Sequence, residues 1–146
     1  HEGTLDKFVG DAIMALWGEP VGQPDHAVRA CKCAVDMITK LEELQKKWTA
    51  EGKYAIDIGI GINTGDMVVG NMGAEGKKMD YTVIGDHVNF AARLCSAARP
   101  GQVIVSEAAW SEAGRRVPAK GPYRVQVKGK AEAQRVYVLD KQGVRA

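Results

Sequence analysis

Every second residue from Ile56 to Ile62 is an isoleucine, and this alternation constrains the fold more than any other stretch of the chain. The residues between them are small or polar, and the whole stretch reads IDIGIGIN. Successive side chains of an extended strand point to opposite faces, so the isoleucines share one face and the small or polar residues share the other. The pattern predicts a strand from Ala55 onward that is well covered on one face.

A repeat of helical period precedes this strand. Apolar residues recur at spacings of three and four, as they do in a helix with one buried face. They are Ala27, Ala30, Cys31, Ala34, Val35, Ile38, Leu41, Leu44 and Trp48. Pro24 and Asp25 are start signals and Gly52 is a stop signal, so the sequence predicts one long amphipathic helix between them.

Near the start of the chain, residues 4–17 predict two strands joined at Gly10 and Asp11, because glycine and aspartate tolerate the backbone angles of a tight turn. Lys7 then lies in the leading strand and Asp11 at the tip. Four residues of extended chain span about 13 Å, so these two side chains cannot hold one small group together. We expect them to serve different atoms or different sites.

The rest of the chain predicts further strands and two more helices. MVVGNMGAEGKKMDYTVIG contains two strand candidates around a glycine- and lysine-rich excursion at residues 70–79. A helix is predicted to begin at Gly85 and Asp86, with Asp86 able to cap its first turn. QVIVS predicts a strand, SEAAWSEAG a short helix, and YRVQVKG and RVYVLD the closing strands.

These elements predict an α+β or mixed α/β sandwich in which helices pack on one face of a largely antiparallel sheet. A chain of 146 residues with 45% hydrophobic content can bury one sizeable core. Residues 1–146 are therefore predicted to form a single domain.

Charge and cysteine content exclude several classes of function. Twenty basic and eighteen acidic residues give a net charge of +2, which favours neither nucleic acid nor direct contact with an anionic membrane. Three cysteines without CxxC spacing predict neither a disulfide framework nor a zinc site. No apolar run approaches the roughly 20 residues of a membrane span, and a cytoplasmic location is expected.

Two polar groupings are candidates for chemistry. Asn89 and Arg93 stand four residues apart on the predicted helix and therefore project from one face. Asparagine can bind a hydroxyl, and arginine offers donors that suit phosphate oxygens. Lys128 and Lys130 flank a glycine that would let a polyanion approach the backbone. Taken singly, each grouping is equally compatible with an ordinary solvated surface.

Four stretches, in this order and at these separations, together resemble the catalytic domain of class III adenylate and guanylate cyclases. They are KFVGDAIMALWG, INTGDMVVGNMG, DYTVIGDHVNFAARL and QVKGK. The resemblance covers almost the entire chain, and its most specific stretch runs from Asp80 to Leu94. It implies a ferredoxin-like cyclase sandwich. It also implies two-metal phosphoryl transfer, in which the ribose 3′-hydroxyl attacks the α-phosphorus of its own nucleoside triphosphate and expels pyrophosphate.

The resemblance assigns roles by position. Asp11 matches the second of two metal-binding aspartates, which would help to hold two Mg²⁺ or Mn²⁺ ions per site. Arg93 matches the arginine that stabilises charge at the α-phosphate, and Asn89 matches the asparagine that orients the ribose. Lys128 matches the lysine that binds the triphosphate tail.

Base choice follows from two further matched positions. Lys7 stands at the purine-reading position, and a lysine donates hydrogen bonds only. Adenine N1 accepts a hydrogen bond, whereas guanine N1 carries a proton. Thr82, at the second base-reading position, can accept from the adenine 6-amino group. ATP is therefore expected over GTP, and the threonine resembles a subclass often described as bicarbonate-responsive.

In this family the active site lies between two protomers, one giving the metal aspartates and the other the base, ribose and arginine residues. The resemblance therefore implies a homodimer with two equivalent sites, with Lys7 of one protomer facing a site whose metal is held by Asp11 of its partner. The excursion at residues 70–79 would serve as an arm between the two protomers.

One departure from the family stands at the start of the sequence. The opening strand that carries the first metal aspartate, in a motif like FADIVGFT, is absent. With one carboxylate of two, the chain as it stands is expected to be a defective catalyst with a poorly protected sheet edge. A fragment of a longer active enzyme, whose membrane attachment stays open, is favoured over a non-catalytic derivative.

Two other readings differ in class. The chain could act as a catalytically silent dimerisation partner, which activity measurements would separate from an enzyme. An unrelated α+β module, such as an RNA-binding ferredoxin-like domain, is disfavoured. RNA binding to a sheet needs exposed aromatic residues, and IDIGIGIN offers isoleucine and glycine there.

Overall fold

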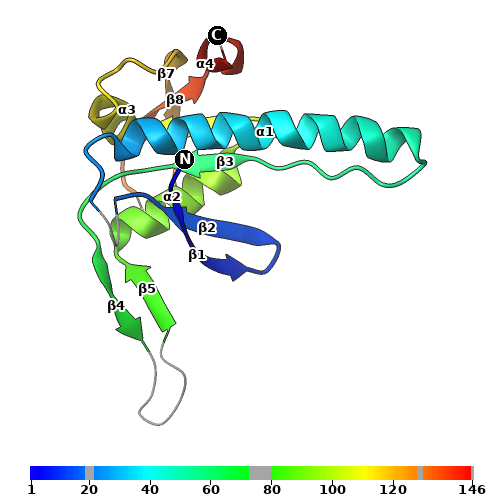
Figure 1. Ribbon diagram of the computed structural model, residues 1–146. Coiled ribbons are helices and arrows are strands. Elements are labelled where there is room, and N and C mark those ends of the chain that lie inside the picture. The colour runs from blue at the N-terminus through cyan, green and yellow to red at the C-terminus, as the bar shows by residue number, and fades with distance from the viewer. Residues whose placement is uncertain (19–21, 73–79, 128–129, 146) are drawn as a thin grey trace.

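The computed structural model describes residues 1–18, 22–72, 80–127 and 130–145, and within them the chain forms eight strands and four helices (Figure 1). The elements in chain order are β1 (Thr4–Val9), β2 (Ala12–Leu16), α1 (His26–Ala50), β3 (Ile60–Ile62), β4 (Val68–Met72), β5 (Asp80–Ile84), α2 (Asp86–Ala97), β6 (Val103–Ser106), α3 (Glu107–Glu112), β7 (Ala119–Val125), β8 (Gln134–Leu139) and α4 (Lys141–Arg145). Residues 73–79, within the predicted excursion, and Lys128 lie outside the described residues.

The central sheet has four strands in the order β3-β6-β8-β7. β3 and β6 run parallel, whereas β8 pairs antiparallel with both β6 and β7. The sheet is therefore mixed and largely antiparallel, as the sequence predicted. Together with the helices it makes an α+β fold.

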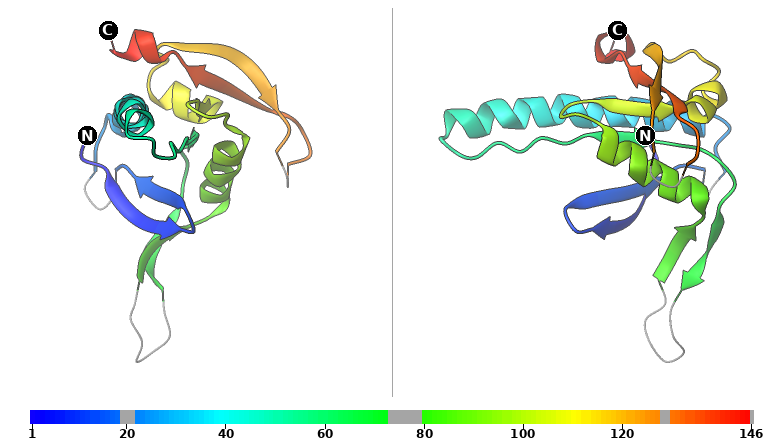
Figure 2. Two further views of the ribbon diagram at one scale, coloured as in Figure 1. Left: turned by 90° about the vertical axis from the view of Figure 1, so that its right-hand side faces the viewer. Right: turned by 180° about the vertical axis from the view of Figure 1, so that it is seen from behind.

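Strand β6 is buried on both faces. Its alternate residues pack against different helices, so the helices lie in two layers. Val103 and Val105 belong to the core cluster that includes the buried face of α1, whereas Ile104 packs with Leu94 of α2. α3 contributes to the α1 side through Ala109. Figure 2 shows α1 and α2 on either side of the strands. The expectation that helices pack on one face is thus wrong for α2, because a strand buried on both faces needs cover from each side.

Two hairpins stand apart from this sheet. β1 pairs antiparallel with β2, and the tight turn between them is Gly10 and Asp11, where Gly10 has a φ of 58°. β4 pairs with β5 in the same way, and this hairpin points away from the helices (Figure 1). Both hairpins confirm the sequence prediction.

Four details differ from the prediction. The closing strand expected over YRVQVKG runs instead from Ala119 to Val125. The strand expected from Ala55 is confined to Ile60–Ile62, because only these residues align with β6. The helix at Asp86–Ala97 has Gly85 as its N-cap without a side-chain capping bond, so Asp86 lies in the first turn rather than capping it. The final helix, Lys141–Arg145, was not predicted.

Helix α1 is far longer than the part of it that the core buries. It has 25 residues, and its buried residues end at Ile38. Beyond that point the helix extends past the sheet (Figure 1). There the Gln45 amide donates to the carbonyl of Ile56 at 2.7 Å and to the carboxylate of Asp57 at 2.6 Å. Within the described ranges, neither this helix nor any other combines the length and apolar character that crossing a membrane requires.

Candidate functional site

Helix α2 carries the predicted pair Asn89 and Arg93. The helix follows β5 after one residue, Gly85, whose φ of 149° turns the chain from strand to helix. Asn89 and Arg93 are both exposed and lie one helical turn apart, so both side chains are available on one face. The donors and acceptors of these two side chains suit a ligand that carries hydroxyl and phosphate groups.

The helix lies directly on the backbone of β3. A Cβ atom built on Gly61 would be 2.7 Å from the carbonyl oxygen of Ala91 and closer still to the amide nitrogen of Cys95. A Cβ on Gly59 would lie 2.8 Å from the Ala98 side chain. Any side chain larger than that of glycine at position 59 or 61 would therefore clash with α2 or with the residue that follows it.

Asn63 is a residue that the sequence reasoning left without a role. Its amide Nδ2 donates to the carbonyl oxygen of His87 at 2.9 Å. Its Oδ1 accepts from the hydroxyl of Ser106 at 2.7 Å, and Ser106 is buried. The sequence marks Asn63 only as an amide on a strand face that otherwise offers glycine and one aspartate, and its partners become visible only in the fold.

The strands that carry the two predicted base-reading residues contact each other. Lys7 lies on β1 opposite Met14, and Thr82 lies on β5 opposite Gly70. β1 contacts β5 although they are far apart in sequence. The Lys7 ammonium lies 3.8 Å from the carboxylate of Asp6, whose side chain is fully buried. This neighbouring carboxylate was not singled out from the sequence.

Asp11 is exposed at the β1–β2 turn. Among the described residues, no group of three or more histidine, cysteine, aspartate or glutamate side chains is placed to hold a metal ion. One carboxylate fits a single ligand position, because Mg²⁺ is often held by one or two carboxylates together with substrate phosphates and water. Asp11 thus fits part of a divalent-metal site rather than a complete one.

One residue near Lys128 contacts α2. Val127 is buried, and the ammonium of Lys130 is 5.4 Å from the ring centroid of Phe90. Phe90 is the residue after Asn89, so the C-terminal lysine segment and the predicted ribose-binding residue belong to one region of the molecule.

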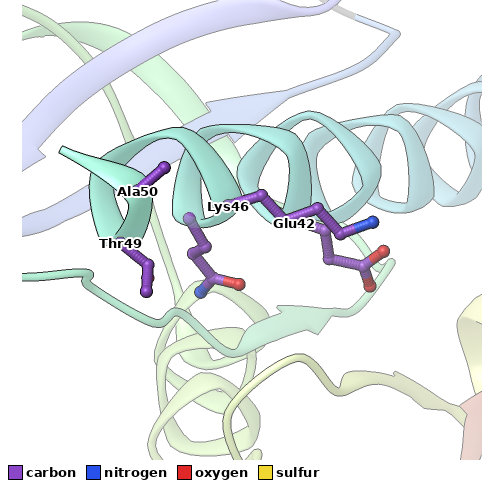
Figure 3. A pocket seen from close by; sticks show the side chains of 5 residues that line it. Glu42, Lys46, Thr49 and Ala50 are labelled. Carbon is purple, nitrogen blue, oxygen red and sulfur yellow. The ribbon is translucent and has the colours of Figure 1, made fainter.

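A hollow elsewhere on the surface contains none of the predicted site residues. It has a volume of about 600 Å³ and lies along the end of α1, where Glu42, Gln45, Lys46, Thr49 and Ala50 line it (Figure 3).

Cys31 does not offer a thiol nucleophile, since burial raises the pKa of its thiol to about 11.

Comparison with known proteins finds the same family over most of the chain. A family model described as the adenylate and guanylate cyclase catalytic domain matches residues 6–141. Adenylate cyclase 1 of Rhizobium meliloti (strain 1021) is 40% identical over 94 residues, which make up 64% of this chain and 14% of that protein. The chain thus spans only a small part of the length of this relative.

Solved structures of the same kind superimpose closely. The guanylyl cyclase Cya2 has a TM-score of 0.87 at 40% identity, over 94% of this chain and 69% of that one. The adenylyl cyclase CyaB from P. aeruginosa has a TM-score of 0.85 at 35% identity, over 94% of this chain and 71% of that one. The ferredoxin-like cyclase sandwich that the sequence predicted is therefore confirmed.

Proposed function

This chain belongs to the family of adenylate and guanylate cyclase catalytic domains, and we propose that it acts as a single adenylate cyclase domain. The ribose 3′-oxygen of ATP would form a bond to the α-phosphorus, and the bond from that phosphorus to pyrophosphate would break. The products are 3′,5′-cyclic AMP and pyrophosphate. The observation that carries the proposal is the exposed Asn89 and Arg93 pair on α2, in a chain whose residues 6–141 match the family.

The two α2 side chains would act on different parts of the substrate. Asn89 would hydrogen-bond the ribose and direct the 3′-hydroxyl toward phosphorus. Arg93 would donate to the α-phosphate oxygens, where negative charge develops during the displacement. Lys128 would bind the triphosphate tail, and the contact of Lys130 with Phe90 supports a position for this segment beside α2.

The base pocket would be formed by β1 and β5. Lys7 donates hydrogen bonds and adenine N1 accepts them, whereas guanine presents a donor at the same position. A threonine at position 82 would accept from the adenine 6-amino group. The contact between β1 and β5 supports this pairing of Lys7 and Thr82. Base selectivity is thus proposed to favour ATP over GTP.

A bound Mg²⁺ or Mn²⁺ ion would supply charge neutralisation on the phosphates, and Asp11 would be one of its ligands. Two ions are proposed per active site. Because the described residues offer one such carboxylate at the β1–β2 turn, the 146-residue chain by itself is expected to turn over slowly or not at all.

The partner in catalysis is proposed to be a second copy of the chain. Lys7 lies within strand β1 opposite Met14, whereas Asp11 lies at the turn, four residues further along the chain. This separation suits two sites better than one. In a two-fold dimer each site would take Asp11 from one protomer and Lys7, Asn89 and Arg93 from its partner.

Activity of the full-length protein with Mn²⁺ and ATP tests the proposal. We expect cyclic AMP and an equal amount of pyrophosphate. The specific activity, which is the rate per protein molecule, should rise with protein concentration in the range where the dimer forms. A dimer that binds ATP and yields no product would instead establish a catalytically silent partner. Preferential use of GTP would contradict the assignment of Lys7 and Thr82.

Replacing Lys7 by glutamate should lower kcat/KM for ATP by about 10–100-fold, since a charge-assisted hydrogen bond to the base is lost and an acceptor faces adenine N1. The GTP rate should fall less or rise. Steady-state kinetics with each nucleotide measure both effects. Lys53→Glu is the matched control, because Lys53 is exposed and its salt bridge to Glu51 lies beyond the end of α1. Equal losses for ATP and GTP in the Lys7 variant would contradict a base-reading role.

A further inference from the structure

One face of β3 and the residues around it is nearly bare of side chains. Gly59, Gly61, Asn63 and Gly65 are spaced by two residues, so in extended chain they share the face turned toward α2. We call these four residues the α2 seat. Gly61 aligns with Ile104 of β6, which also packs on the α2 side.

The glycines of the α2 seat bring the helix close without fixing its position along the strand. Cβ atoms added at all three glycines would collide with α2 or with the residue after it: Gly59 with Ala98, Gly61 with Ala91 and Cys95, and Gly65 with the ring of His87. A smooth row of glycines has no side chain that interlocks with a helix ridge. Contact with such a row sets the distance of α2, whereas its placement along the strand depends on other contacts: the packing of Leu94 with Ile104, the Cys95 thiol that donates to the Gly59 carbonyl oxygen at 3.5 Å, and the bridge at its first turn.

Asn63 is the member of the seat with a side chain that holds the helix. Its amide donates to the carbonyl oxygen of His87, in the first turn of α2. Its carbonyl oxygen accepts from Ser106. Ser106 is anchored in turn, because it is 2% exposed and its hydroxyl oxygen caps α3 by accepting from the amide of Ala109 at 3.1 Å. The bridge thus ties the start of α2 to the buried junction of β6 and α3.

We infer that Asn63 is a positioning residue for the α2 site. Its bridge fixes the first turn of α2 on the seat, while Leu94 and Cys95 hold the later turns, and so it fixes where Asn89 presents its polar atoms and, one turn on, Arg93. His87 lies two residues before Asn89, within the same turn, so a shift at this carbonyl moves the ribose-binding side chain directly. The inference rests on the proposed function for what Asn89 and Arg93 bind, whereas the bridge itself is independent of that function.

Asn63→Asp in the full-length protein is the test, because aspartate has the same shape. The carboxylate still accepts from Ser106, but it presents an oxygen instead of an N–H to the His87 carbonyl. We expect kcat for cyclic AMP formation to fall by about tenfold, since the loss of one oriented hydrogen bond misplaces the reacting groups. KM for ATP and Tm should change little by comparison. In the 146-residue chain, amide hydrogen exchange in the first turns of α2 should become faster.

Gln45→Glu is the matched control. It also replaces an amide donor, here one to the backbone carbonyl of Ile56 and to the carboxylate of Asp57, at the far end of α1 and away from α2. We expect its kcat and its α2 exchange rates to equal those of the parent protein. If Asn63→Asp lowers Tm but leaves kcat and α2 exchange unchanged, Asn63 is a structural residue only and the inference fails.

Measurements of kcat and α2 hydrogen exchange on the parent and the Asn63→Asp protein distinguish failure of this inference from failure of the proposed function. Absence of cyclic AMP formation by the parent protein would overturn the proposed function, yet the exchange measurement would still decide whether Asn63 holds α2. Faster α2 exchange without a change in kcat of an active parent would overturn the positioning role. Faster exchange together with a lower kcat supports it.

Discussion

Replacing Arg93 by alanine in the full-length protein should lower kcat for cyclic AMP formation by about 10²–10³-fold. The physical reason is that Arg93 would donate to oxygens whose charge increases as the bond from the α-phosphorus to pyrophosphate breaks. An interaction that is stronger in the transition state than in the ground state changes kcat more than KM. Tm should stay near that of the parent, because Arg93 is exposed on α2. Product formation and thermal melting measure the two quantities.

Arg99→Ala is the control for this variant, since Arg99 is an exposed arginine just beyond the end of the same helix. We expect its kcat to match the parent. Arg93→Lys should recover only a small part of the activity, because an ammonium cannot reproduce the planar fork of a guanidinium. An Arg93→Ala protein with unchanged kcat would show that the arginine has no part in the chemistry.

Gly61→Ala should destabilise the chain by about 1–3 kcal/mol, which is the usual cost of forcing extra atoms into a close-packed contact. The added methyl group would meet the Ala91 carbonyl oxygen at 2.7 Å, and backbone atoms cannot rotate away as a flexible side chain can. Either α2 moves away from β3 or the strand shifts in its pairing with β6. Denaturant unfolding of the 146-residue chain measures the loss.

Gly22→Ala provides the comparison for Gly61, because a Cβ on Gly22 would meet nothing within 4 Å. Its effect on unfolding free energy should lie within about 0.5 kcal/mol of zero. Unchanged stability in Gly61→Ala would mean that α2 does not rest on the β3 backbone as closely as described here. It would also remove the geometric basis for the seat.

The elements with strong periodicity were predictable from the sequence. The helical repeat that ends near Gly52 became α1, and the turn at Gly10 and Asp11 became the β1–β2 turn. In both cases the signal is local, because amphipathic spacing and turn chemistry depend on residues close together in the chain. The helix that carries Asn89 and Arg93 was predictable for the same reason.

Features that depend on distant partners were not predictable in the same way. The isoleucine alternation was expected to give a long strand, yet only Ile60–Ile62 found a partner, since pairing depends on where β6 begins and ends. The cover on both faces of β6 likewise depends on how helices pack rather than on any one stretch. Local propensity yields to such tertiary context.

The candidate site likewise contains features that local sequence predicts and features that depend on distant residues. The pair on α2 could be proposed from spacing alone, but its assignment to ribose and phosphate, like the assignments of Lys7, Thr82, Lys128 and Asp11, came from resemblance to the family. The bridge from Ser106 through Asn63 to His87 joins residues far apart in sequence, so no local pattern could reveal it. Only the packing of β3 against α2 brings those three groups together.

The uneven burial of α1 has a consequence for how this chain melts. Its core-facing residues end at Ile38, and short helical segments without tertiary support are marginal in water. The outer turns can therefore unravel while the sheet is intact. Among the three tryptophans, Trp110 stacks on Tyr137 beside the core and reports on it, whereas Trp48 lies in the outer part of α1. Signals from these two tryptophans should trace separate transitions, so the unfolding free energy of the core, which Gly61→Ala lowers, does not describe the outer turns of α1.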